Sequence, residues 1–347
     1  MCMKHLFESL QSRLLATLIL VSGLLTSCDK ETQTWENDGR TATITLHVPM
    51  AESSVTRTTD EEYQQAETKI NTLRILILSP DNQPIVNKKF GSQEITGGNL
   101  TIEGVPVGTV TICAIANEAA LGKNYDNFED FENDLVDVGN KKKLRIIDEQ
   151  RTHFPKRFTE PEIAQYGLPM SWIDREAEIA QPGPTPQTIE VNLERAVAKL
   201  NIIMNNALTT PITITSMTFG QFFGDQLYLF REATLDIPDE TTYATQEYTG
   251  VSIEIPGGES KTLACYIYPS YAWKDNTPSS PYTIGFTTTT APYPSKAFID
   301  ENSGALNSIA RNKQVNIHAT LSAEASILLK FEVKDWNTHS IEVPPFN

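Results

Sequence analysis

Apolar and polar residues alternate along several stretches of the chain, and this alternation predicts β-strands. In residues 41–49 the apolar side chains of Ala42, Ile44, Leu46 and Val48 recur at every second position. A half-buried strand has this period. Residues 70–78 are almost continuously apolar, which is typical of a buried strand. Further strands are predicted at residues 100–103, 108–116, 189–204, 212–222, 228–230, 251–255, 261–268, 282–288, 314–321 and 327–333.

Short strands separated by Gly, Pro and Asn turns predict a mainly β protein built from β-sandwiches. The best candidate helix is residues 127–138, with Asn127 as its cap and Phe128, Phe131, Leu135 and Val138 on one face. Residues 51–66 are rich in Ser, Thr, Glu and Gln and predict a protease-accessible loop. The proline-rich residues 181–187 exclude a helix or a central strand, so we place a loop near a domain boundary there.

The first 28 residues have the pattern of an export signal. Basic residues precede the apolar residues 14–25, a stretch too short to span a bilayer. The sequence Leu25-Thr26-Ser27-Cys28 then resembles the lipobox of bacterial lipoproteins, in which small residues precede the acylated cysteine. We therefore predict a signal peptide over residues 1–27 and lipidation at Cys28. An ordinary cleaved signal peptide with an incidental cysteine is the alternative.

Length and charge narrow the remaining possibilities. A chain of 347 residues suggests two domains. With 28 Lys and Arg against 44 Asp and Glu, the net charge is −16, and the only basic cluster is Lys141-Lys142-Lys143. Nucleic acid is therefore excluded as a partner, because phosphate binding needs concentrated positive charge. Cys113 and Cys265 lie in apolar runs and are expected to be buried free thiols, with a disulfide as the alternative.

No catalytic, cofactor or metal motif stands out in the sequence. The histidines of the mature chain are scattered, and the acidic clusters indicate solvated surfaces. Two carboxylates brought together only by the fold remain as a glycosidase alternative. We predict that the protein is not an enzyme, and that it has no cofactor and no metal.

Several strings of residues together resemble the fimbrillin family of Bacteroidales, the major fimbrial subunit and Mfa-like proteins of type V pili. The strings, besides the lipobox, are Leu73-Arg74-Ile75-Leu76-Ile77, Cys113-Ala114-Ile115-Ala116-Asn117-Glu118, Leu168-Pro169-Met170-Ser171, Leu193-Glu194-Arg195-Ala196-Val197-Ala198-Lys199-Leu200, Ala310-Arg311-Asn312 and Val333-Lys334-Asp335-Trp336. Each string alone is weak. Their order and spacing cover nearly the whole mature chain.

The resemblance implies two transthyretin-like β-sandwich domains with a few short helices, and export as an outer-membrane lipoprotein precursor. We expect residues 28–57 to form a tether and N-terminal strand that proteolysis removes, and residues 58–187 and 188–347 to form the two domains. A trypsin-like surface protease is expected to cut after Arg57. Arg40 and Lys69 are poorer sites because they border predicted strands.

Removal of the strand containing Ala42, Ile44, Leu46 and Val48 would uncover a groove with unpaired backbone groups. A strand from another pilus subunit could fill such a groove, and head-to-tail repetition would build a cell-surface fimbrium. The candidate donor is the alternating set Ile327, Leu329, Phe331 and Val333, followed by Ile341 and Val343. An ordinary pair of internal strands is the alternative.

The second hypothesis for the whole protein is a surface lipoprotein that does not polymerise. It would act as a pilus anchor, as an adhesin for a host or bacterial surface ligand, or as a glycan-binding protein.

Overall fold

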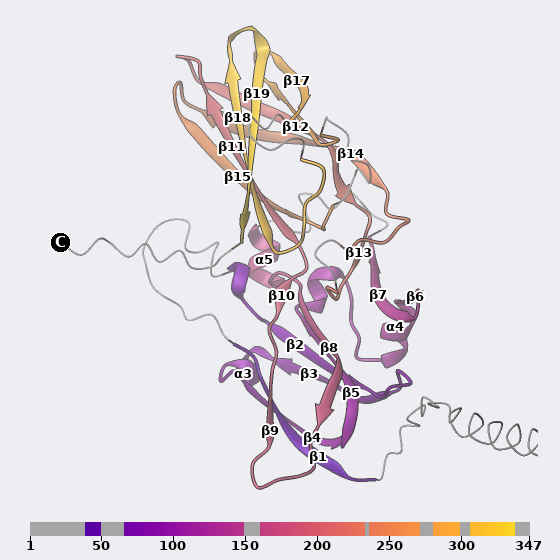
Figure 1. Cartoon of the computed structure of the whole chain (residues 1–347). Helices are drawn as coiled ribbons and strands as arrows, with labels where there is room; N and C mark the ends of the chain where they lie inside the picture. Colours follow the sequence, from indigo (N-terminus) through magenta and orange to yellow (C-terminus); the bar gives the residue numbers. More distant parts are fainter. Residues whose placement is uncertain are drawn as a thin grey trace, which may run out of the picture. The chain divides into compact units, whose positions relative to one another are not determined.

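The computed structural model describes residues 39–49, 66–148, 160–232, 236–270, 280–298 and 306–336. These residues are mainly β with a few short helices, which confirms the predicted secondary-structure class (Figure 1). The helical segments include α3 (Ser92–Ile95), η1 (Glu118–Leu121), α4 (Phe128–Asn133), α5 (Glu160–Tyr166) and η3 (Ala323–Ala325). Among the described helices, none has the length and apolar character needed to cross a membrane.

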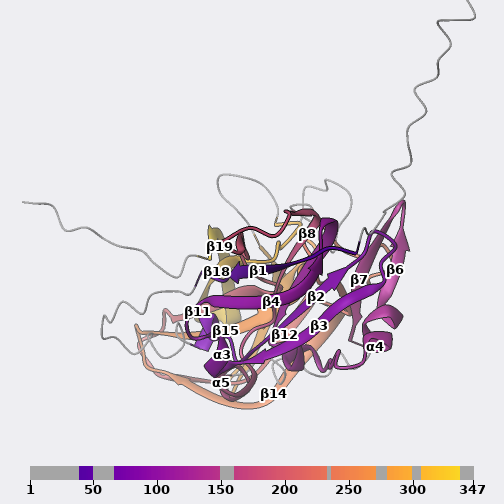
Figure 2. The ribbon, with the colours of Figure 1, turned by 90° about the horizontal axis from the view of Figure 1, so that it is seen from below.

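The β1 sheet contains the first described strand in its centre. Its order is β4 (Asn99–Pro106), β1 (Thr41–His47) and β9 (Gln187–Glu190). β1 runs antiparallel to β4 and parallel to β9, and Figure 2 shows β1 lying along β4. The alternating residues of β1 fall into buried and half-buried classes in turn, so the predicted strand and its buried face are both present.

The β5 sheet packs against the β1 sheet. Its order is β10 (Glu194–Arg195), β8 (Met170–Ile179), β5 (Gly108–Ala116), β2 (Thr72–Leu78) and β3 (Pro84–Gly91). One face joins the β1 sheet in a hydrophobic cluster, and the other face contributes Leu76, Cys113 and Ile115 to a second cluster. Burial on both faces explains why β2 and β5 are continuous apolar runs.

The C-terminal half forms two four-stranded sheets around a third hydrophobic cluster. The β11 sheet has the order β15 (Ser260–Ile267), β11 (Ala198–Asn206), β18 (Lys313–Ser322) and β19 (Ser326–Asp335). The β12 sheet has the order β14 (Tyr243–Ile255), β12 (Ile212–Gly224), β16 (Thr283–Thr288) and β17 (Pro292–Ala297).

A small β7 sheet joins the two halves of the sequence. Its order is β13 (Gln226–Tyr228), β7 (Lys141–Ile147) and β6 (Leu135–Val138). The lysine run lies on β7, where Lys141 pairs with Glu232 at 3.1 Å and Lys143 pairs with Asp236 at 2.8 Å. These lysines therefore hold an acidic segment of the same chain.

Three secondary-structure predictions were wrong in part. The predicted strand 228–230 overlaps the observed β13 only at Tyr228, because it is residues 226–228 that pair with β7. The predicted helix 127–138 ends at Asn133, because Leu135–Val138 pairs with Lys141–Leu144 as a hairpin whose turn contains Gly139 at φ 64°. The predicted strand 189–204 is three strands, β9, β10 and β11, because the chain crosses there from the β1 sheet to the β5 sheet and then to the β11 sheet. The division into two domains at residues 187 and 188 stays a prediction.

Cys113 and Cys265 are free and buried, as expected from their apolar surroundings. Burial raises the pKa of the Cys113 thiol to about 12 and that of the Cys265 thiol further. Because the thiolate is the reactive form, both should resist a thiol reagent such as dithionitrobenzoate at pH 8. Titration should count two more reactive thiols after unfolding in guanidinium than before. An equal count in both states would contradict this burial.

Candidate functional site

β1 is held by side-chain burial and by backbone pairing on both edges. Ala42 is 7% exposed, Ile44 and Leu46 are 0% exposed, and Val48 is 1% exposed. Leu46 lies opposite Leu100 of β4 and Ile189 of β9. The Val48 backbone N–H donates to Gly98 O at 2.7 Å. Without β1, β4 and β9 would face each other across an apolar groove with unpaired backbone edges; we call this the β1 groove.

Two sequence-predicted site residues, Cys28 and Arg57, lie outside the described residues. Arg57 belongs to residues 50–65, which separate the end of the β1 segment from Ala66. Of the two poorer cleavage candidates, Arg40 directly precedes β1, and Lys69 lies before β2 with its Nζ donating to Ala164 O at 3.3 Å. A cut within residues 50–65 would separate β1 from the chain that follows.

The chain is pinned immediately after this segment by a buried polar group that we call the Glu67 cluster. Glu67 is 2% exposed, and its carboxylate accepts hydrogen bonds from Tyr266 OH at 2.7 Å, Trp336 Nε1 at 3.0 Å and Lys199 Nζ. The Arg195 guanidinium lies 4.4 Å from the Trp336 ring centroid, and its Nε donates to Glu67 O at 3.1 Å. The Glu67 carboxylate therefore joins the segment before β2 to Trp336, which directly follows β19.

A second buried cation, Arg311, fixes residues 191–195, which lead from β9 through β10 and which we call the crossing segment. Its guanidinium donates to Leu229 O at 2.6 Å, to Arg195 O at 3.0 Å and to Ser171 Oγ at 2.9 Å. Burial lowers the pKa of Arg311 to about 10, so it stays protonated at neutral pH. Sequence reasoning assigned no role to Glu67 or Arg311. Arg195 and Arg311 do occur, each next to an Ala, in two of the strings that resemble the fimbrillin family.

The candidate donor residues lie on β19, which forms the edge of the β11 sheet. Ile327 is 3% exposed and Leu329 is 2% exposed, and both belong to the C-terminal hydrophobic cluster. Phe331 is partly buried, with its ring 6.1 Å from that of Phe298, whereas Val333 is 47% exposed. Residues 326–335 all pair with β18. In this structure, the four residues therefore belong to an internal hairpin.

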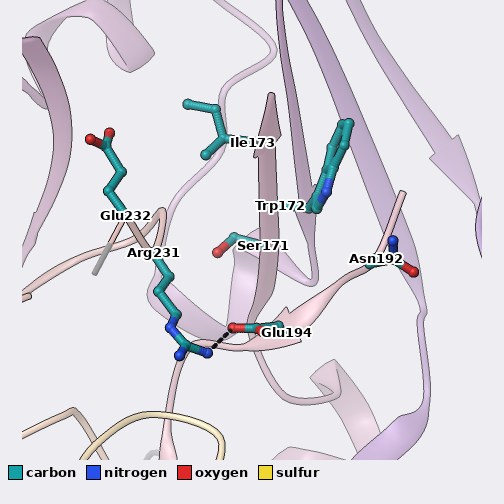
Figure 3. A pocket seen from close by; sticks show the side chains of 7 residues that line it. All are labelled: Ser171, Trp172, Ile173, Asn192, Glu194, Arg231 and Glu232. Atoms are coloured by element: carbon teal, nitrogen blue, oxygen red, sulfur yellow. Dashed lines mark hydrogen bonds and ion pairs between the residues drawn. The ribbon is translucent and has the colours of Figure 1, made fainter. Parts of the chain in front are cut away.

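A cavity of about 490 Å³ lies beside the short strand β10. Figure 3 shows Trp172 and Ile173 on either side of Ser171, with Arg231 reaching Glu194 below it. The residues lining the cavity are Ser171, Trp172, Ile173, Asn192, Glu194, Arg231 and Glu232.

The two carboxylates of this cavity do not form an acid–base pair. The Arg231 guanidinium pairs with Glu194 at 2.8 Å. Burial by itself would raise the pKa of Glu232, but hydrogen bonds from Arg175 and Lys141 outweigh this and lower it. A general acid needs a raised pKa. Glu232 therefore does not have the electrostatics of a glycosidase general acid. Within the described residues, no group of His, Cys, Asp and Glu is arranged to hold a metal.

Residues 37–342 match the family model of the fimbrillin-A associated anchor proteins Mfa1 and Mfa2. The chain belongs to this family. It is a non-enzymatic, fimbria-associated protein, which confirms the sequence resemblance and the prediction that the protein is not an enzyme. A fimbrial protein acts at the cell surface, whereas anchoring by a lipid stays a prediction.

Two solved fimbrial proteins align with most of the chain. The tip fimbrial protein Mfa3 from Porphyromonas gingivalis aligns with TM-score 0.51 and 13% identity, covering 86% of this chain and 99% of that one. Fimbrilin FimA from the same species aligns with TM-score 0.49 and 12% identity, covering 85% and 97%. The fold of this fimbrial protein is therefore fimbrillin-like on the strength of the first alignment. No curated protein matches the sequence.

The burial of β1 predicts a sharp difference between its two faces. Leu46→Ala should lower the free energy of unfolding by about 3 kcal/mol, since it deletes a fully buried side chain. Thr43→Ala, on the half-buried face of the same strand, should change it by less than about 0.5 kcal/mol. Urea unfolding followed by circular dichroism measures both values. Similar losses for the two variants would show that β1 does not bury one face selectively.

The Glu67 cluster predicts a large penalty for removing a single carboxylate. Glu67→Ala leaves Lys199, Tyr266 and Trp336 without their buried acceptor and should destabilise the fold by about 3 kcal/mol or more. The matched control is Asp137→Ala, because Asp137 pairs with Lys142 while its side chain is 78% exposed. Thermal unfolding should show a much lower midpoint for the first variant and little change for the second. A midpoint unchanged by Glu67→Ala would contradict the pinning role of this cluster.

Proposed function

We propose that this protein is a structural subunit of a cell-surface fimbria, which polymerises by strand exchange after proteolysis removes its N-terminal strand. The observation that carries the proposal is the position of β1, which lies between β4 and β9 with its inward residues fully or almost fully buried. β1 is separated from the rest of the body in sequence by residues 50–65, which contain Arg57. A single cut can therefore detach a central strand.

The energetics favour replacement of β1 over an empty groove. Burying each aliphatic side chain is worth about 1.5–3 kcal/mol, so losing Ile44, Leu46 and Val48 would cost several kcal/mol. The facing edges of β4 and β9 would also lose their backbone partners. An incoming strand with the same alternation would restore both contributions, which is strand addition. Repeated head to tail between subunits, such a contact does not close and builds a filament.

In this proposal, Cys28 carries the lipid that delivers the precursor to the outer membrane, and a trypsin-like surface protease cuts after Arg57. Cleavage then releases the subunit from its lipid and opens the β1 groove in one step. The Glu67 cluster supports this proposal, because Glu67, ten residues after Arg57, would still be bonded to Tyr266 and Trp336 after the cut. The description of the two halves as transthyretin-like sandwiches, divided near residue 187, is part of the proposal.

The donor strand is proposed to come from the C-terminal region of a neighbouring subunit. If β19 itself were donated, Ile327 and Leu329 would leave the C-terminal cluster and Trp336 would leave Glu67. That cost favours a donor that follows Trp336, such as Ile341 and Val343, which lie outside the described residues. The set Ile327, Leu329, Phe331 and Val333 remains the costlier candidate.

A second candidate function is a pilus anchor that keeps its lipid and does not polymerise. The observation that favours it is the family itself, whose model describes anchor proteins. In such a protein β1 would stay in place and the lipid on Cys28 would remain attached. Other pilus subunits would then be partners of an intact surface lipoprotein. An adhesin for a surface ligand is a variant of the same candidate.

The deciding experiment is N-terminal sequencing and mass spectrometry of protein taken from the cell surface. Polymerisation after cleavage predicts a mature N-terminus at Thr58 and SDS-resistant ladders, and Arg57→Ala should abolish both. Arg40→Ala is the matched control, because Arg40 precedes β1 and its loss should leave processing unchanged. Protein that stays lipidated at Cys28 and monomeric under protease exposure would contradict the polymer and support the anchor.

A further inference from the structure

The cavity beside β10 lies at the edge of strand β8. Trp172 packs against the hydrophobic cluster between the β1 and β5 sheets, whereas Ile173 packs against the cluster on the other face of the β5 sheet. Successive side chains of a strand point to opposite faces. Both residues line the same cavity. A space that touches both faces of one strand must lie along its edge.

The backbone of Ile173 faces this cavity. β10 pairs with β8 only at Met170 and Ser171, and the Ala196 N–H donates to Pro169 O at 2.8 Å. In an antiparallel ladder, every second residue directs its N–H and C=O to the same neighbour. Pro169, Ser171 and Ile173 therefore share an edge, but the ladder stops before Ile173. Among the backbone bonds of the described residues, none joins Ile173 to Asn192, where the next pair would be.

The charges around the cavity select a neutral ligand. An anion would be repelled by Glu194 and Glu232. A cation would be repelled by Arg231 and by Arg175, which pairs with Glu232. A wholly apolar ligand would remove water from the Glu194–Arg231 pair without replacing its hydrogen bonds. What fits is a neutral group rich in donors and acceptors, with an apolar side for Trp172. An extended peptide has this chemistry, and its spacing matches that of the strand edge.

We propose that this cavity is a docking site for an extended, uncharged peptide segment of another protein, which continues the β5 sheet by pairing its backbone with Ile173. The segment would pair with the edge of β8 beyond the point where the pairing of β8 with β10 ends. Its alternate side chains would lie against Trp172 on one face and Ile173 on the other. This site is separate from the β1 groove, and its occupation does not require proteolysis. It gives the fimbrial protein a second surface for contacting a partner subunit.

The test uses the full chain labelled with ¹⁵N-isoleucine and titrated with acetyl-Ser-Val-Thr-Val-Ser-amide. The Ile173 amide signal, assigned from an Ile173→Val variant, should shift in a saturable manner. The same peptide N-methylated at its central residue is the matched ligand control. It should bind about tenfold more weakly, because it cannot donate the central backbone hydrogen bond.

Variants of the protein separate the site from general effects. Trp172→Ala should weaken binding about fivefold or more through the loss of an aromatic contact, and Glu332→Gln, on the distant strand β19, should leave it unchanged. The ligand comparison on the natural sequence decides the matter even if Trp172→Ala fails to fold. An unmoved Ile173 signal, or equal binding of the N-methylated peptide, would overturn the proposal. A shift produced by N-acetylglucosamine but not by the peptide would overturn it in favour of a saccharide site.

Discussion

The fold depends on two buried cations and one buried carboxylate that meet where the sheets of the chain join. Arg195, Arg311 and Glu67 are each less than a tenth exposed. Removing charged groups from water is costly unless each finds partners. Here the partners come from β8, β15, residue 229 and the end of β19. This requirement fixes the relative positions of segments that are as much as 269 residues apart in the sequence.

The contrast with β1 bears on the proposal that this strand is exchanged. No buried charge holds β1, and its inward contacts are aliphatic side chains and backbone pairs. Its polar contact at His47, a hydrogen bond between the ring Nδ1 and Asn99 Oδ1 at 2.9 Å, lies at the exposed end of the strand. Aliphatic burial and a backbone ladder can be supplied by any strand with the same alternation. Directional bonds to Glu67 and Arg311 cannot be replaced in this way.

The same contrast determines which features of the structure could be predicted from the sequence. Alternation predicted β1 and its buried face, because burial on one face of a sheet leaves a period of two. The apolar run 108–116 predicted both ends of β5, because burial on both faces leaves a continuous run. Leu135–Val138 was misjudged because its apolar spacing also fits a helix, and only the pairing with Lys141–Leu144 decides the conformation. The partners of Glu67 leave no local pattern at all. Four of the strings that resemble the fimbrillin family nevertheless contain residues of these polar contacts, namely Ser171, Arg195, Lys199, Arg311 and Trp336.

The crossing segment connects the groove to the edge cavity. β9 pairs with β1 in one sheet, and β10 pairs with β8 in the next, with only residues 191–193 between them. Asn192 and Glu194, which line the cavity, are therefore tied to the strand that would lose its partner under the proposed removal of β1. Arg311 holds the other end of this segment through Arg195 O. In the proposed exchange, an incoming strand would restore the support of β9, on which the wall of the cavity at Asn192 depends.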